Sequence, residues 1–117
     1  MRRRAHFVLR FPNTREVQME KVLSRVLRGA ALLDERSPHW FETVNLTTFT
    51  MRLIGKCVLS YAYGDFFVGL EALGMTMAKS VAYGFSTNRM SEYNAITTLW
   101  RDEILARRML KRARFRS

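Results

Sequence analysis

The chain has 117 residues, of which 48% are hydrophobic, and it carries a formal net charge of +10. This length is close to the commonest size of a single domain, and two domains would each be too small to be stable without disulfides or a metal. The single cysteine, Cys57, excludes an internal disulfide and is expected to be a small buried side chain in a reducing compartment. The sequence contains no run of eighteen apolar residues, which excludes an ordinary membrane-spanning helix.

Positive charge is concentrated at both ends of the chain. Residues 1–30 carry eight Lys/Arg against two acids (+6), residues 31–88 carry four against five (−1), and residues 89–117 carry eight against three (+5). Sixteen of the twenty basic residues are arginine, whose forked guanidinium suits bidentate contacts with phosphate. A neutral middle between two basic ends indicates a polyanionic partner.

Residues 1–12 are predicted to form a basic, extended N-terminal arm that ends at Pro12. Asn13 followed by Glu16 matches a capping box, and a helix is expected behind it because apolar residues recur there at three- and four-residue spacing. These apolar positions are Met19, Val22, Leu23, Val26, Leu27 and Ala30. A neighbouring face of the same helix carries a basic stripe, which consists of Lys21, Arg25 and Arg28. This stripe is either a solvated surface or a phosphate-binding surface.

The middle of the chain decides the fold class. After a polar connection, Trp40 and Phe41 are expected to cover the core. Residues 46–62 place their apolar side chains on one half of a helical wheel, which predicts a helix. The alternative is a β-hairpin over residues 43–63, and it would make the fold α+β. The helix is preferred because neither face of the two strands would be consistently apolar.

A break is predicted at Gly64 and Asp65, with the glycine ending one helix and the aspartate capping the next. Apolar residues at helical spacing then predict a second helix over 66–81, and the two helices would pack as a central αα-hairpin. Within a helix, each glycine costs about 1 kcal/mol relative to alanine. Close backbone approach at the hairpin interface is the expected compensation for Gly69, Gly74 and Gly84.

The last helix is expected to begin after Ser91 as its cap, and its inward arc carries Tyr93, Ile96, Trp100 and Ile104. Beyond Ala106 the same arc is taken by Arg107, Arg108, Lys111 and Arg114. This switch predicts a helix that packs on the body and then projects past it. The expected fold is therefore mostly α, a small bundle of about four helices. It is organised as the arm 1–12, a single helical domain over 13–106, and a basic helical extension over 107–117.

The sequence lacks the residue patterns of common catalytic and metal sites. His6, His39 and Cys57 have no metal-ligand spacing, and neither a nucleophile elbow nor a dinucleotide fingerprint occurs. Residues 69–76 have the glycine spacing of a phosphate-binding loop, but Met75 stands where that loop needs lysine. We therefore expect no enzyme activity and no cofactor.

Two acids within the apolar middle, Asp65 and Glu71, are a further candidate for catalysis. A structural role is the simpler interpretation, since Asp65 stands where a helix cap is expected. The two carboxylates are expected to cap a helix and to pair with Arg52, Lys56 or Lys79 across the hairpin.

These observations favour a non-enzymatic, nucleic-acid-binding component of a larger ribonucleoprotein assembly, such as a divergent or organellar ribosomal protein. RNA is preferred to DNA because Phe7, Phe11 and Phe115 lie among arginines, where they are placed to stack on bases. Neighbouring proteins of the assembly are the other expected partners, in the cytoplasm or an organelle matrix. The expected phosphate contacts are Arg2, Arg3, Arg4, Lys21, Arg25, Arg28, Arg107, Arg108, Lys111, Arg112, Arg114 and Arg116.

Two other functions stay open at this point. One is a protein-interaction subunit of a membrane-associated complex, in which the basic ends would meet anionic headgroups. The other is a small regulatory or inhibitor protein, with Trp40 and Trp100 as the anchors of its interface.

Overall fold

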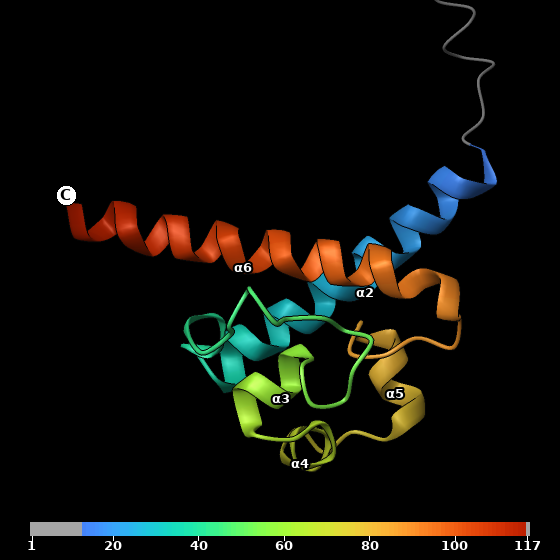
Figure 1. Ribbon diagram of the computed structural model, residues 1–117, viewed down its shortest axis with the longest axis horizontal. Helices are drawn as coiled ribbons and strands as arrows, with labels where there is room; N and C mark the ends of the chain where they lie inside the picture. The colour runs from blue at the N-terminus through green and yellow to red at the C-terminus, as the bar shows by residue number, and fades with distance from the viewer. Residues whose placement is uncertain (1–12, 117) are drawn as a thin grey trace, which may run out of the picture.

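The computed structural model describes residues 13–116, except for the side chains of residues 115 and 116, and this part of the chain is mostly helical and contains no strand (Figure 1). The predicted mostly α class is confirmed, and the α+β alternative is wrong. The arm predicted over 1–12 lies outside the described residues. In chain order the elements are α2 (Thr14–Arg36), η1 (Trp40–Glu42), α3 (Val58–Tyr63), α4 (Phe66–Ala72), α5 (Met77–Ala82), η2 (Met90–Glu92) and α6 (Tyr93–Arg116).

The two long helices, α2 and α6, pack against each other along the length of the body (Figure 1). The predicted capping box starts α2: the Glu16 amide donates to Asn13 Oδ1 at 2.8 Å, and the Asn13 amide donates to Glu16 Oε1 at 3.1 Å. The buried positions recur at helical spacing, as the sequence predicts. They are Val22, Val26, Ala30 and Leu33 on α2 and Ile96, Trp100 and Ile104 on α6.

Two tryptophans occupy the centre of the core. The rings of Trp40, in η1, and Trp100, in α6, meet edge to face with centroids 5.6 Å apart, and Phe85 stacks on Trp100 at the same separation. Each buried indole has a hydrogen-bond acceptor: Trp100 donates to the Gly84 carbonyl at 2.7 Å, and Trp40 donates to Asp34 Oδ1 at 2.9 Å. Trp40 is therefore part of the core itself, whereas the sequence predicts that it covers the core, and its contacts fix η1 between α2 and α6.

The helix predicted over 46–62 does not form before Val58, because residues 43–57 fold as a succession of turns. Side chains of α6 bind the backbone of this segment: Thr97 accepts from the Met51 amide at 2.9 Å, and Arg101 donates to the Leu46 carbonyl at 3.1 Å. These bonds satisfy backbone groups that a helix would otherwise satisfy, so the segment can bury Phe49 and Met51 without helical structure.

The helix predicted over 66–81 is divided into α4 and α5. Gly74 has a φ of +65°, and its amide donates to the Glu71 carbonyl while the Met75 amide donates to the Leu70 carbonyl, at 3.0 and 2.9 Å. This pair of bonds is the Schellman arrangement that ends a helix. Thr76 then caps α5 by accepting from the Lys79 amide at 3.1 Å. The expectation that Gly74 lies at a close backbone approach is therefore wrong, since a Cβ there would meet nothing within 4 Å.

The other predicted breaks and glycine contacts are largely found. Gly64 ends α3, and Asp65 caps α4 by accepting from the Phe67 and Val68 amides at 2.9 and 3.2 Å. A Cβ on Gly69 would lie 3.0 Å from the Leu59 Cβ, so α3 and α4 do approach closely there. Gly84 also makes a close approach, although against the backbone of α2 rather than within a hairpin.

Candidate nucleic-acid interface

The basic stripe predicted on α2 faces α5 and the chain that follows it. Arg28 donates to the Ala82 carbonyl at 2.9 Å, and its guanidinium carbon lies 6.0 Å from the centroid of the Tyr83 ring. Arg25 forms an ion pair with Glu92 at 3.1 Å, and Lys21 is exposed. The stripe is therefore one edge of a surface shared with α5 and residues 83–92.

A hollow of about 640 Å³ lies between this stripe and the turn that precedes α6. Lys21, Ser24 and Arg25 line it from α2, and Asn88 and Arg89 line it from the turn. Arg89 is exposed and adds a further cation to the hollow, although it lies more than sixty residues from Lys21 and Arg25 in the sequence. Sequence reasoning missed Arg89 because it lies alone in a polar turn, outside any basic cluster. Hydrogen-bond donors and cations converge here, which is the requirement for holding a phosphate.

Buried Glu92 organises one wall of the hollow. Its side chain is 7% exposed and accepts hydrogen bonds from Gln18, Arg25 and Thr87. Burial alone would raise the pKa of Glu92, but the hydrogen bonds from Thr87 and Gln18 and the charge of Arg25 outweigh burial and hold the pKa below its ordinary value. Glu92 is therefore ionised at neutral pH and keeps the Arg25 guanidinium in one position. Glu20 also lines the hollow and is exposed.

A second, smaller hollow of about 360 Å³ lies on the other side of α5. The end of α2 contributes Arg36, and α5 contributes Lys79; both side chains are exposed. The turn between α4 and α5 forms part of its wall. Cations therefore border α5 on both sides. We call this set the basic surface, and its members are Lys21, Arg25, Arg28, Arg36, Lys79 and Arg89.

The structure places three of the predicted C-terminal phosphate contacts against the body instead of in an extension. Arg107 forms ion pairs with Asp34 at 2.8 Å and Glu103 at 2.7 Å, and its guanidinium carbon lies 5.5 Å from the Trp40 ring centroid. These carboxylates raise the pKa of Arg107. Burial would raise the pKa of Asp34, but the hydrogen bonds from Arg107 and Trp40 and the charge of Arg107 together outweigh burial and hold that pKa below its ordinary value. Arg107 therefore joins α6 to the end of α2.

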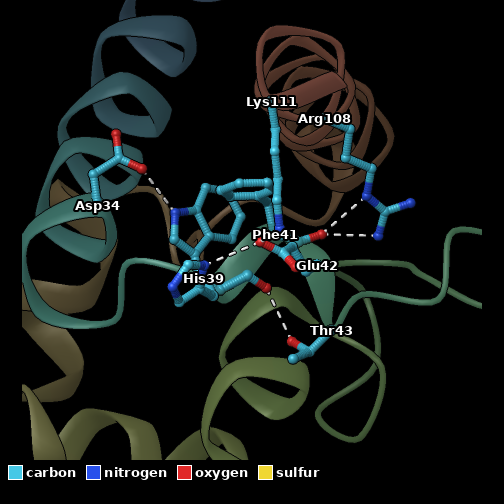
Figure 2. A network of polar contacts seen from close by, with 8 residues as sticks. Asp34, His39, Phe41, Glu42, Thr43, Arg108 and Lys111 are labelled. Atoms are coloured by element: carbon cyan, nitrogen blue, oxygen red, sulfur yellow. Dashed lines mark hydrogen bonds and ion pairs between the residues drawn. The ribbon is translucent and has the colours of Figure 1, made fainter. Parts of the chain in front are cut away.

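Arg108 and Lys111 join α6 to η1, as Figure 2 shows. Arg108 donates to the Phe41 carbonyl at 2.8 Å and also to the Val44 carbonyl, and Lys111 pairs with Glu42 at 2.5 Å. The hydrogen bond from Lys111, with a second one from His39, holds the pKa of Glu42 below its ordinary value. The helix thus remains attached to the body as far as Lys111, within the stretch 107–117 that is predicted as an extension.

Two of the remaining predicted contacts lie within the described part of the chain, and they do not join the basic surface. Arg112 and Arg114 are exposed near the C-terminal end of α6 and line neither of the two hollows. Arg2, Arg3 and Arg4 lie outside the described residues, as does the side chain of Arg116. The predicted residues whose side chains the structure describes therefore form at least two separate groups.

Of the two candidate acids, Asp65 has the predicted capping role, and neither forms the predicted ion pairs. Asp65 caps α4 as predicted, and Glu71 is exposed. Between residues 13 and 116, neither carboxylate forms an ion pair with Arg52, Lys56 or Lys79, so the predicted pairing across the hairpin is wrong. Cys57 is buried, as expected.

The described residues contain no group of three or more His, Cys, Asp and Glu side chains placed to hold a metal ion. Among the helices of residues 13–116, none combines the length and the apolar character needed to cross a bilayer. Comparison with known protein families, with characterised proteins and with solved structures finds no match for this chain.

Proposed function

We propose that the protein binds nucleic acid without catalysing a reaction on it, as a component of a larger assembly, and that the basic surface holds the phosphates. The observation that carries the proposal is the convergence of cations on both sides of α5 from parts of the chain that are distant in sequence. Neutralising phosphates is the main source of sequence-independent affinity for nucleic acid. The preference for RNA, as part of a ribonucleoprotein, rests on arginines and phenylalanines of residues 1–12 and 115–116.

The charges at the basic surface differ in how freely they can meet a ligand. Lys21 and Arg89 are exposed and line the same hollow, whereas Arg25 is already paired with Glu92 and Arg28 with a backbone carbonyl. Lys21 and Arg89 should therefore make the direct phosphate contacts, and Arg25 and Arg28 should add to the local potential from fixed positions.

The test measures affinity for labelled RNA and DNA by fluorescence anisotropy at several salt concentrations. In a Lys21→Gln/Arg89→Gln variant, the slope of log affinity against log salt should become shallower by about 1.4 to 1.8, because each phosphate contact contributes about 0.7 on single strands and 0.9 on duplex DNA. The matched control is Arg52→Gln/Lys56→Gln, which removes the same charge from exposed positions in the 43–57 segment. The control should leave the slope nearly unchanged.

Two outcomes would contradict the proposal. Equal effects of the two double variants would mean that only net charge attracts nucleic acid, and that the basic surface is not a site. Absence of binding by the unmodified protein at low salt would refute nucleic-acid binding altogether.

One observation favours the alternative of an interaction subunit. On α6 beyond Ile104, three large apolar side chains are exposed, by 42% for Leu105, 66% for Met109 and 59% for Leu110. Exposed apolar side chains beside Arg112 and Arg114 suit a membrane surface with anionic headgroups. Flotation with vesicles of phosphatidylcholine and phosphatidylserine tests this alternative. It requires binding that a Met109→Gln variant weakens, and the absence of binding would refute it.

A further inference from the structure

The arrangement of α4 and α5 has a consequence for the kind of nucleic acid that fits. The helix α4 has seven residues and α5 has six, and residues 73–76 connect them. The two helices cross at a steep angle, since α4 is seen nearly end-on in the view in which α5 is seen from the side (Figure 1). Two short helices at a steep angle, joined by a turn of three or four residues that often contains glycine, define the helix-turn-helix motif.

The turn between them is fixed by its own bonds. Gly74 takes the left-handed conformation, the Schellman bonds end α4, and the Thr76 side chain starts α5. Leu73 is buried in the core and Met75 packs against it, so apolar contacts hold both sides of the glycine. The conformation of residues 73–76 is therefore fixed by contacts within the chain.

The helix α5 is anchored by one face and exposed on the other. Ser80 is fully buried and donates to the Met77 carbonyl at 2.6 Å, while Arg28 of α2 binds the Ala82 carbonyl at the end of the helix. Met77 is 54% exposed, and Ala78 and Lys79 are also exposed. These three exposed side chains, here called the ridge, lie at the beginning of α5; Lys79 also lines the smaller hollow, and Val81 of the same helix lines the larger one.

A ridge with cations on both sides matches the major groove of duplex DNA. That groove is about 12 Å wide, admits a helix, and has a phosphate backbone along each edge. With α5 in the groove, Lys21 and Arg89 face one backbone while Arg36 faces the other. The major groove of A-form RNA is too deep and narrow for side chains to reach its bases, so the same ridge has no place in an RNA duplex.

We propose that α4 and α5 form a helix-turn-helix unit and that α5 enters the major groove of duplex DNA. This inference rests on the proposed function for its phosphate contacts, and at this surface it replaces the preference for RNA by duplex DNA. The side chains that reach the bases are Met77 and Ala78, whose methyl groups suit the methyl group of thymine, and Lys79, whose ammonium suits O6 and N7 of guanine. Because α5 has only six residues, one molecule reads a short site.

The experiment is a selection from duplex DNA with a random core, with a duplex RNA library of the same design and a single-stranded RNA library run beside it. We expect a short motif to be enriched from the DNA duplex and none from the RNA duplex. On the enriched DNA, methylation of guanine N7 with dimethyl sulfate should interfere with binding, because N7 lies in the major groove.

The variants separate the ridge from the surrounding charge. Ala78→Glu should weaken binding to the enriched DNA by about tenfold or more, the loss expected when a base contact is replaced by repulsion. Ala106→Glu is the matched control, since it makes the same change at an exposed alanine of α6, and it should alter affinity by less than about twofold. Lys79→Ala should relax the preference for guanine within the motif.

The two proposals fail in different ways. If the Lys21→Gln/Arg89→Gln variant reduces the salt slope while no DNA motif is enriched and Ala78→Glu binds normally, the helix-turn-helix inference is wrong and the proposed function stands. Enrichment of a single-stranded RNA motif alone would also overturn the inference and support the ribonucleoprotein interpretation. If nothing binds, both proposals are wrong.

Discussion

Replacing Gly84 by alanine should be among the most destabilising of the small substitutions in this protein. Gly84 has a φ of +70°, and a Cβ built there lies 2.8 Å from the Cα and the amide nitrogen of Val26. The left-handed conformation costs an alanine about 1 to 2 kcal/mol, and overpacking costs about 1 to 3 kcal/mol. The neighbouring atoms belong to the backbone of α2 beside buried Val26, so they cannot move aside as a flexible side chain would. The expected loss in the free energy of unfolding is therefore about 2 to 5 kcal/mol.

Gly64→Ala separates the two contributions. Gly64 has a φ of +91°, and a Cβ there would meet nothing within 4 Å, so this variant should lose only the conformational part, about 1 to 2 kcal/mol. Urea denaturation followed by tryptophan fluorescence measures both, because Trp40 and Trp100 are buried in the core. If Gly84→Ala lowers the free energy of unfolding by no more than Gly64→Ala does, Gly84 does not lie in close contact with the backbone of α2, and the packing described above is wrong. A Gly84→Ala variant too unstable to fold, beside a folded Gly64→Ala variant, agrees with the expectation.

Three further predictions concern the ion pairs and hydrogen bonds that hold α6 and η2. Glu92→Gln should lower the free energy of unfolding by about 1 to 2 kcal/mol, because it replaces a charge-assisted bond to Arg25 by a neutral one; unchanged urea midpoints would contradict this. The depressed pKa values of Glu92 and Asp34 mean that their contribution is complete above the ordinary carboxyl pKa and is lost as the pH falls through the folded values. Urea midpoints should therefore fall between about pH 5 and pH 3, and less steeply in Glu92→Gln; equal pH dependence in the two proteins would exclude Glu92 as a source. Arg108→Met should lower the free energy of unfolding by about 1 to 3 kcal/mol, because the carbonyl groups of Phe41 and Val44 lose their donor. The control Arg112→Met, at an exposed position, should change the free energy of unfolding by less than about 0.5 kcal/mol.

Local signals in the sequence were sufficient for the two long helices. Asn13 and Glu16 are three residues apart and satisfy each other, so the start of α2 depends on neighbours in the sequence alone. The inward positions of α6, such as Ile96 and Trp100, follow from helical spacing for the same reason.

The middle of the chain could not be predicted in this way, because its structure depends on distant partners. Backbone groups of the turns over 43–57 are bound by Thr97, an acceptor, and Arg101, a donor, of α6, and no pattern within 43–57 indicates these partners. The apolar spacing over 66–81 fits one helix as well as two. Phe66 and Leu70 of α4 are buried at that spacing, but Met77 of α5 is exposed and the buried residue of α5 is Ser80. Only the positive φ of Gly74 separates the two cases, and a sequence does not show the sign of φ at a glycine.

The candidate site shows how far a count of charges can mislead. Arg107, Arg108 and Lys111 continue the arc of α6 that carries Ile96, Trp100 and Ile104, and a continuous helix must turn that arc toward the body. Cations on a buried arc require acceptors nearby.

Those acceptors lie in the segment that the sequence shows as nearly neutral: Asp34 and Glu42 pair with α6, as do backbone carbonyl groups of the chain around η1. The positive charge of the C-terminal residues is therefore partly neutralised within the fold by the acidic side chains of the middle segment. Among the described residues, exposed cations such as Lys21, Arg89 and Lys79 border α5 on both sides, where no run of basic residues occurs in the sequence. Attraction for a polyanion should accordingly follow Lys21 and Arg89 more closely than Arg107 and Arg108, although the second pair lies in the more basic stretch of the chain.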